Sequence, residues 1–237
     1  PRWLTIPVVS KGKRHQIIRD VAIDNHDNFA DKHLKAIELN YKNAPYFNTV
    51  FPEIEQILNI SAKNNLADTT IDLIFCLKRL LGNNTPMMRS SDLTANGTKA
   101  ELLSSFCEQV DATEYLAPPG SRGYLESSDA FEKLGITVRY LSFHHPIYPQ
   151  LFGDFLPYMS CLDMLFNCGS QAPSLIKGAS SCSKWKYLIC DLLLISIHDT
   201  NIVLRVLHSP LTRLVYFSSN YAKKSHHSIG NQGERPW

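Results

Sequence analysis

Residues 87–124 constrain the fold more than any other stretch, because they have the order strand, loop, helix, strand, loop. A short extended run ends at Arg89, and apolar residues recur at helical spacing over residues 102–110. A second extended run, Glu114–Ala117, leads into a loop with two glycines at residues 118–124. This order predicts a βαβ unit, whose strands run parallel and whose loops gather at one edge of a sheet.

Three amphipathic stretches come before this unit. Apolar residues at helical spacing predict helices over residues 24–41, 47–58 and 65–81, with Gly82 as the stop of the third. We expect a strand over residues 3–9, a capping box formed by Thr98 and Glu101, a short helix near residues 127–134, a strand over residues 136–141 and a helix over residues 155–166. The pattern predicts an α/β fold, with a mainly parallel sheet, flanking helices and a three-helix insertion.

The composition excludes several classes of protein. A net charge of +2 over 237 residues gives no surface dedicated to a polyanion, and no basic face carries interleaved aromatic residues. No apolar run reaches the ~18 residues that a membrane-spanning helix needs. The six cysteines include no CxxC pair with zinc spacing. We therefore expect a cytoplasmic protein with reduced thiols, no metal centre, no transmembrane segment and no nucleic-acid partner.

The character of the sequence changes at about residue 177. Beyond it, apolar runs at residues 187–197, 202–207 and 211–217 alternate with serine, histidine and asparagine. Residues 222–237 are polar and have no period. We interpret residues 1–177 as one α/β domain and residues 178–237 as a separate tail that is partly disordered or not native to the domain.

Polar and charged side chains follow the predicted strands. Because the carboxyl ends of parallel strands lie at one edge of a sheet, we expect the loops after them to meet there. Two arginines on such a rim suit an anionic small molecule. The predicted ligand-binding residues are Arg89, Ser91, Gly120, Arg122, Gly123 and Tyr124. The predicted catalytic residues are Asp92, as a base or hydroxyl-orienting group, and His144, as a proton-transfer group.

Each feature also has a structural interpretation, and the residues alone leave both open. The glycine loop is compatible with a tight turn that exposes Arg122, as well as with anion binding by backbone N–H groups. Arg89 is compatible with a surface ion pair to Asp92. The pair His144–His145 is compatible with a structural loop, and the basic run at residues 11–14 is typical of a solvated turn.

Several blocks of sequence, in a consistent order and spacing, resemble the WbqC-like protein family over residues 1–177. They include WLTIPV at residues 3–8, YKNAPYF at 41–47, RSSDL at 89–93, GSRGYL at 120–125 and LDMLFNCG at 162–169. Family members usually carry a further N-terminal segment before the WLTIPV block. The resemblance therefore implies a domain that is truncated at its N-terminus and has lost its first strand, and it does not extend to the tail.

The resemblance implies a bacterial protein of surface-polysaccharide biosynthesis, including that of O-antigen and lipopolysaccharide. It implies a transferase that acts on an activated, nucleotide-linked amino sugar and moves a small amino-acid group, such as glycine, onto it. Two other interpretations stay open. One is a non-catalytic binding or scaffold subunit of polysaccharide assembly, and the other is an inactive fragment.

Overall fold

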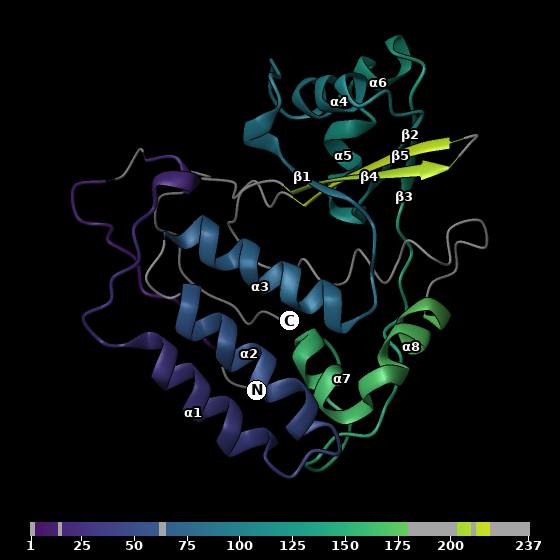
Figure 1. The fold of residues 1–237 in the computed structure, drawn as a ribbon. Helices are drawn as coiled ribbons and strands as arrows, with labels where there is room; N and C mark the ends of the chain where they lie inside the picture. The colour runs from purple at the N-terminus through teal and green to yellow at the C-terminus, as the bar shows by residue number, and fades with distance from the viewer. Residues whose placement is uncertain (1–2, 14–15, 62–64, 180–202, 210–211, 219–237) are drawn as a thin grey trace, which may run out of the picture.

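Figure 1 shows the computed structural model of the chain, which describes residues 3–13, 16–61, 65–179, 203–209 and 212–218. The α-helices are α1 (Phe29–Tyr41), α2 (Phe47–Ser61), α3 (Leu66–Leu80), α4 (Ala100–Gln109), α5 (Arg122–Leu125), α6 (Ala130–Lys133), α7 (Cys161–Cys168) and α8 (Ala172–Gly178). Four 3-10 turns are η1 (Ile18–Asp20), η2 (Ser90–Asp92), η3 (Pro119–Ser121) and η4 (Gly169–Gln171). The strands are β1 (Met87–Arg89), β2 (Glu114–Ala117), β3 (Thr137–Tyr140), β4 (Val203–Ser209) and β5 (Thr212–Ser218).

The strands form one sheet in the order β1-β4-β5-β2-β3. β2 is parallel to both β3 and β5, whereas β4 is antiparallel to both β1 and β5. Among the described strands, β1, β2, β3 and β5 therefore point in one direction and β4 alone is reversed. The chain has an α/β fold, as predicted. β1 and β2 are co-directional but not adjacent, because the β4–β5 hairpin lies between them (Figure 1).

The predicted three-helix insertion consists of α1, α2 and α3. Helix α3 shows why the sequence defines its ends: the Asn65 side chain accepts a hydrogen bond of 2.8 Å from the backbone N–H of Asp68. After the helix, the chain turns at Gly82, whose φ of 63° lies in the left-handed region. The helices α1, α2, α3, α7 and α8 gather on one side of the sheet, and α4, α5 and α6 lie on the other (Figure 1).

Three predicted elements differ in the structure. The helix predicted over residues 24–41 begins only at Phe29, because Asn28 has a φ of 42°. Residues 3–9 form no strand, and their ladder is reduced to one isolated bridge between Val8 and Ile23. Pro7 has no N–H to donate, which limits any longer ladder. The predicted helix over residues 155–166 begins only at Cys161, because Tyr158 has a φ of 62° and the Ser160 hydroxyl caps the helix by accepting from the N–H of Leu162 at 3.3 Å.

The start of α4 keeps only half of the predicted capping box. The Glu101 carboxylate accepts from the backbone N–H of Thr98 at 3.5 Å. Lys99, with a φ of 51°, occupies the N-cap position, and no side chain there caps the helix. The hydroxyl of Thr98 therefore does not make the reciprocal bond that a complete box requires.

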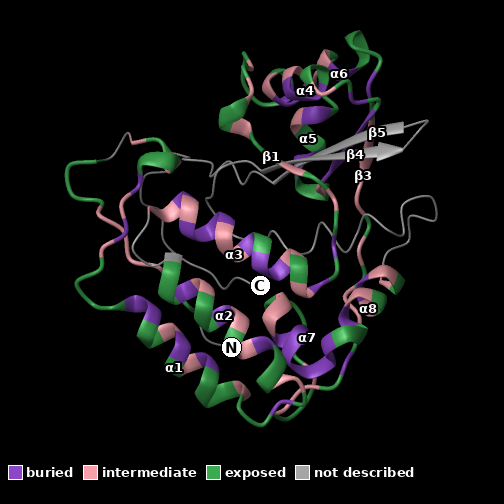
Figure 2. Cartoon of the chain, viewed as in Figure 1, coloured by how far each residue is buried: buried purple, intermediate pink, exposed green. Residues whose placement is uncertain are grey.

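Two apolar cores lie on the two sides of β2. Because side chains alternate along a strand, Tyr115 and Ala117 pack with α4 and α6, whereas Leu116 packs with the helices of the larger core. The larger core includes Ile54, Leu165 and other buried residues of α1, α2, α3, α7 and α8. Figure 2 shows that α7 is buried along most of its length, which makes it the central helix of this core.

The tail is only partly described. Two of the apolar runs beyond residue 177 correspond to β4 and β5, while residues 187–197 and 222–237 lie outside the described residues. Among the described cysteines, Cys76, Cys107, Cys161 and Cys168 are free thiols. None of the described helices is long and apolar enough to cross a membrane.

Candidate functional site

The loops after β1 and β2 leave the sheet at the same edge. Arg89, the last residue of β1, is opposite Val203, and Val203 is opposite Ser218. Tyr115 is opposite Val215 of β5. Three residues further along these parallel strands, Ser218 is level with Pro118. The register therefore places the ends of β1 and β2 at one level of the sheet, as the prediction of a common rim requires.

The same register also separates the two loops. Three strand spacings lie between β1 and β2 in the order of the sheet, which corresponds to ~14 Å. Arg89 and the loop of Arg122 therefore share a rim without being neighbours. A ligand that contacts both loops has to reach across the two strands between them.

The loop after β2 holds its arginine against the next strand. The Arg122 guanidinium carbon lies 4.1 Å from the centroid of the Tyr140 ring, at the end of β3. One Arg122 nitrogen is 2.9 Å from a carboxylate oxygen of Glu126, and both side chains are more than half exposed. The ring and the carboxylate together fix the direction of the guanidinium while leaving other N–H groups accessible.

The rest of this loop is a closed turn. The Ser121 hydroxyl is buried with its residue and donates a 2.6 Å hydrogen bond to the Pro118 carbonyl. Gly120 and Gly123 are exposed, and a Cβ added to either would meet nothing within 4 Å. Tyr124 packs against the smaller core, and burial raises the pKa of its phenol. The two glycines thus leave open space at the rim, whereas Tyr124 anchors the turn.

The loop after β1 does not contain the ion pair between Arg89 and Asp92 that the sequence left open. Arg89 pairs with Asp68, in the first turn of α3, at 3.0 Å between Nη1 and Oδ1, and not with Asp92. Asp92 is exposed and accepts a 3.3 Å hydrogen bond from the Ser91 hydroxyl. Arg89 therefore links the sheet to the helical insertion, while Ser91 and Asp92 remain together on η2.

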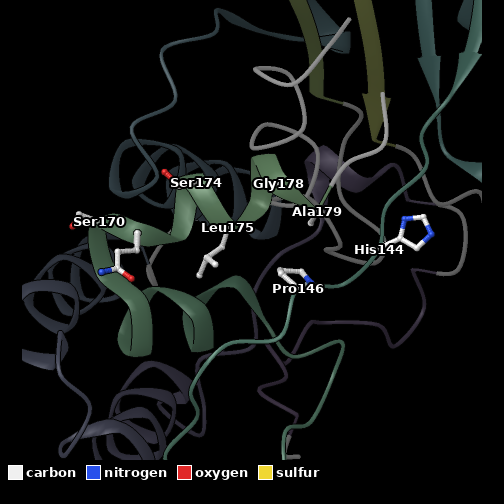
Figure 3. A pocket seen from close by; sticks show the side chains of 8 residues that line it. His144, Pro146, Ser170, Ser174, Leu175, Gly178 and Ala179 are labelled. Atoms are coloured by element: carbon white, nitrogen blue, oxygen red, sulfur yellow. The ribbon is translucent and has the colours of Figure 1, made fainter. Parts of the chain in front are cut away.

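His144 lies at a different place, beside a cavity of about 770 Å³ next to α8. Its backbone N–H donates a 2.9 Å hydrogen bond to the carbonyl of Ala179, which ties the loop after β3 to the end of α8. Figure 3 shows His144 and Pro146 on this loop, alongside the helix that carries Ser174. His144 follows Tyr140 by four residues, a distance of at most ~14 Å along the chain.

The two adjacent histidines have separate environments. His145 packs among aromatic rings, with centroids 6.2 Å from Tyr148, 5.7 Å from Phe155 and 5.5 Å from Tyr158. One of its ring nitrogens, Nδ1, lies 3.0 Å from the Pro146 carbonyl. These contacts give His145 a packing role, whereas the exposed His144 is the histidine that lines the cavity.

The predicted site residues thus fall into three groups: Arg89 with Ser91 and Asp92, the Arg122 loop, and His144. The first two groups share the rim of the sheet and the third lines the cavity. Among the described residues, no group of three or more histidine, cysteine, aspartate or glutamate side chains is placed to hold a metal ion.

Sequence reasoning missed the most heavily hydrogen-bonded carboxylate in the described residues. Asp163, on α7, is only 6% exposed and accepts bonds of 2.9 Å from the hydroxyls of both Tyr41 and Tyr148. The side-chain amides of Gln150 and Asn167 donate at 2.8 and 3.4 Å. Burial, followed by the nearby carboxylate, raises the pKa of Tyr41 and Tyr148 well above the ordinary tyrosine value. An aspartate inside a mainly apolar helix was the sequence signal that could have identified it.

This carboxylate fixes the segment that precedes α7. Tyr148 and Gln150 belong to that segment, and Gln150 also bonds both the N–H and the carbonyl of Leu156, at 2.8 and 3.1 Å. The segment after β3 is therefore held by hydrogen bonds at two places, to the carbonyl of Ala179 and to the carboxylate of Asp163. These bonds position His144 beside α8.

The fold and the rim define an α/β protein with two exposed arginines at the carboxyl edge of its sheet. The chain belongs to the WbqC-like protein family, whose model matches residues 1–175. It is 34% identical over 177 residues to a protein of Mycobacterium tuberculosis named "Uncharacterized protein Rv1507c", which covers 74% of this chain and 76% of the relative. No solved structure matches the chain.

Proposed function

We propose that this protein is a transferase of bacterial surface-polysaccharide assembly that acts on a nucleotide-linked amino sugar. The group transferred in this proposal is a small aminoacyl unit such as glycine. Membership of the WbqC-like family supports the biological setting, and the similar mycobacterial protein supports a bacterial one. The geometry of Arg122 is the observation that carries the choice of an anionic, nucleotide-linked substrate.

Arg122 has the properties of a diphosphate ligand. Its guanidinium is held 4.1 Å over the Tyr140 ring, so little side-chain entropy remains to be lost when a phosphate binds. Its ion pair with Glu126 is exposed, and exposed pairs contribute only ~0–1 kcal/mol. A diphosphate, which carries two negative charges in a nucleotide-linked sugar, can therefore displace Glu126. The open space around Gly120 and Gly123 lets the ligand approach the backbone of the loop.

The other groups have matching roles in this proposal. Arg89, which is also held by one exposed ion pair, binds a second anionic part of the substrates, with Ser91 as a hydroxyl donor beside it. Tyr124 keeps the loop of Arg122 in place through its packing. Asp92 orients a hydroxyl or amine of the substrate that reaches the β1 side of the rim.

The proposed reaction is aminoacyl transfer. The amine of the sugar attacks the activated carbonyl carbon of the amino acid, a C–N bond forms, and the bond to the leaving group breaks. The nitrogen then loses a proton. His144 is the proposed acceptor of this proton, because an imidazole accepts and releases protons near neutral pH and this one lies beside a cavity.

The separation of the three groups supports a second candidate, a binding subunit without catalytic activity. The strands that lead to Arg89 and to the Arg122 loop are three strand spacings, ~14 Å, apart, and His144 lies on a third loop. A protein that presents a nucleotide sugar to another enzyme needs only the arginine sites. The two candidates differ in one respect, the formation of a product.

The test combines binding with product formation. The full chain is incubated with UDP-linked amino sugars, and ligand binding is measured by thermal shift and calorimetry. We expect Arg122→Ala to weaken binding by about tenfold, because one charge-assisted hydrogen bond is lost. Lys133→Ala is the matched control, since Lys133 also forms an exposed i,i+4 pair, with Asp129 at 3.0 Å.

Mass spectrometry of reactions with activated glycine then separates the two candidates. A glycine adduct on the amino sugar that disappears in His144→Ala supports the transferase. Binding without any adduct supports the non-catalytic subunit. Equal loss of binding in the Arg122 and Lys133 variants, or no binding at all, contradicts the proposed nucleotide site.

A further inference from the structure

The cavity beside α8 has no lysine, arginine, aspartate or glutamate among its described lining residues. Its walls are formed by residues of η4, α8 and the loop after β3, and its volume of about 770 Å³ is within the range of small-molecule sites. The residues that line it are serine, glutamine, histidine, proline, leucine, glycine and alanine. We propose that this cavity binds a neutral polyhydroxyl ligand, namely a pyranose ring of a sugar.

The polar side chains on the α8 side of the cavity come from η4 and the first turn of α8. They are Ser170, Gln171 and Ser174. All three are exposed, and no hydrogen bond engages their side chains within the described part of the chain. Two hydroxyls and one amide are thus available as donors and acceptors, which is the pairing that sugar hydroxyls need.

The apolar groups provide a surface for the carbon skeleton of a sugar. Leu175 and Pro146 line the same cavity, and a Cβ added at Gly178 would meet nothing within 4 Å. A pyranose has an apolar face of C–H groups and an edge of hydroxyls. Leu175 and Pro146 can contact the C–H face, and the serines can bond the hydroxyl edge. In ligand pockets a small number of polar groups in a mostly apolar wall fix the orientation of the ligand.

The described lining residues include no lysine or arginine, which disfavours a phosphate. A phosphate bound against these residues would lose solvation without a permanently charged side chain to compensate it, which costs free energy. The rim arginines are the better place for the anionic part of a substrate. The inference rests on the proposed function, in which a sugar is part of the substrate, and it assigns that sugar to the His144 cavity.

The first experiment titrates N-acetylglucosamine, a neutral sugar, into the full-length isotope-labelled chain and follows backbone amide shifts. We expect shifts at His144 and at residues 170–178. Ser174→Phe fills the cavity from an exposed position and should weaken binding by about tenfold or more. Ser10→Phe places the same side chain on an exposed serine of the N-terminal loop and should leave binding unchanged.

The double variant Ser170→Ala, Ser174→Ala removes the hydroxyls without adding bulk. It should also weaken the binding of N-acetylglucosamine, and its unchanged melting temperature would show that the fold is intact. Shifts that persist in Ser174→Phe, shifts confined to the rim, or no shifts at millimolar sugar would overturn the inference.

UDP, which carries no sugar, separates this inference from the proposed function. We expect UDP to bind the wild type and the Ser174→Phe variant equally well, and Arg122→Ala weakly. Binding of N-acetylglucosamine without any binding of UDP leaves the cavity as a sugar site and refutes the nucleotide site. Binding of UDP at the rim without binding of N-acetylglucosamine refutes the sugar site and leaves the nucleotide site in place.

Discussion

The Tyr148 hydroxyl donates a 2.9 Å hydrogen bond to Oδ2 of Asp163, and both residues are buried. Tyr148 belongs to the segment after β3, whereas Asp163 belongs to α7. Tyr41, on α1, donates to the other carboxylate oxygen at 2.9 Å. One carboxylate therefore connects two helices and the loop that carries His144.

We expect Asp163→Asn to destabilise the protein by ~1–3 kcal/mol. The amide retains the shape of the carboxylate but places an NH₂ group opposite donors that need an acceptor, and an unmade buried hydrogen bond costs that much. Urea denaturation followed by circular dichroism measures the change in the free energy of unfolding. Asp154→Asn, an exposed aspartate of the preceding loop, is the control and should change it by less than ~0.5 kcal/mol.

The raised pKa of Tyr148 predicts a loss of stability in alkali. Its folded pKa lies above the ordinary value of 10.0, because burial and the Asp163 carboxylate favour the neutral phenol. Its contribution is complete below pH 10.0 and is lost as the pH rises through the folded pKa. The free energy of unfolding should fall by ~1 kcal/mol per pH unit in this window. If the free energy of unfolding of a Tyr148→Phe variant falls as steeply above pH 10.0 as that of the wild type, the loss of stability does not come from Tyr148.

Gly169→Ala should be one of the most damaging single substitutions. A Cβ there would lie 2.2 Å from Cδ1 of the Tyr46 ring, and Gly169 has a φ of 50°. We expect a loss of more than ~3 kcal/mol, which combines overpacking with a strained backbone. Gly135→Ala is the matched control, because Gly135 has a φ of 66° and no atom near its Cβ position.

The control should lose only the ~1–2 kcal/mol of the left-handed backbone. Thermal and urea unfolding of the two variants give the difference between them. Equal losses in the two glycine variants would show that the Tyr46 ring moves aside at little cost.

Cys107 should resist alkylation in the native protein. It has no exposed surface, and burial raises the pKa of its thiol well above the ordinary cysteine value. Treatment with iodoacetamide at neutral pH, followed by peptide mass spectrometry, should find Cys107 unmodified in buffer and modified in urea. Modification at the same rate in both conditions would mean that α4 opens readily.

Local signals predicted the helical insertion well. In α3 the apolar period, the cap at Asn65 and the turn at Gly82 agree, so the predicted residues 65–81 nearly coincide with Leu66–Leu80. The start of α7 was less predictable, because the residues before it are apolar at helical spacing. Their conformation is determined by contacts of Gln150 with Leu156 and with Asp163, which no local pattern contains.

The site was predictable in its parts and not in its assembly. Strand direction placed Arg89 and the Arg122 loop on one edge, as expected. Strand order is a property of the whole chain, and the hairpin at residues 203–218 separates the two loops. The network of Asp163 was beyond sequence reasoning for a similar reason, since Tyr41 lies 122 residues away along the chain.

Within the described part of the chain, the side chains that donate to Asp163 are all neutral, so these bonds respond little to ionic strength. Tyrosine and amide donors are not screened by dissolved salt, whereas the exposed pairs of Arg89 and Arg122 are. Concentrated salt should therefore release the two arginines from their carboxylates while the joint between α1, α7 and the loop stays closed. Added salt alone can therefore free the arginine side chains at the rim without breaking the hydrogen bonds to Asp163.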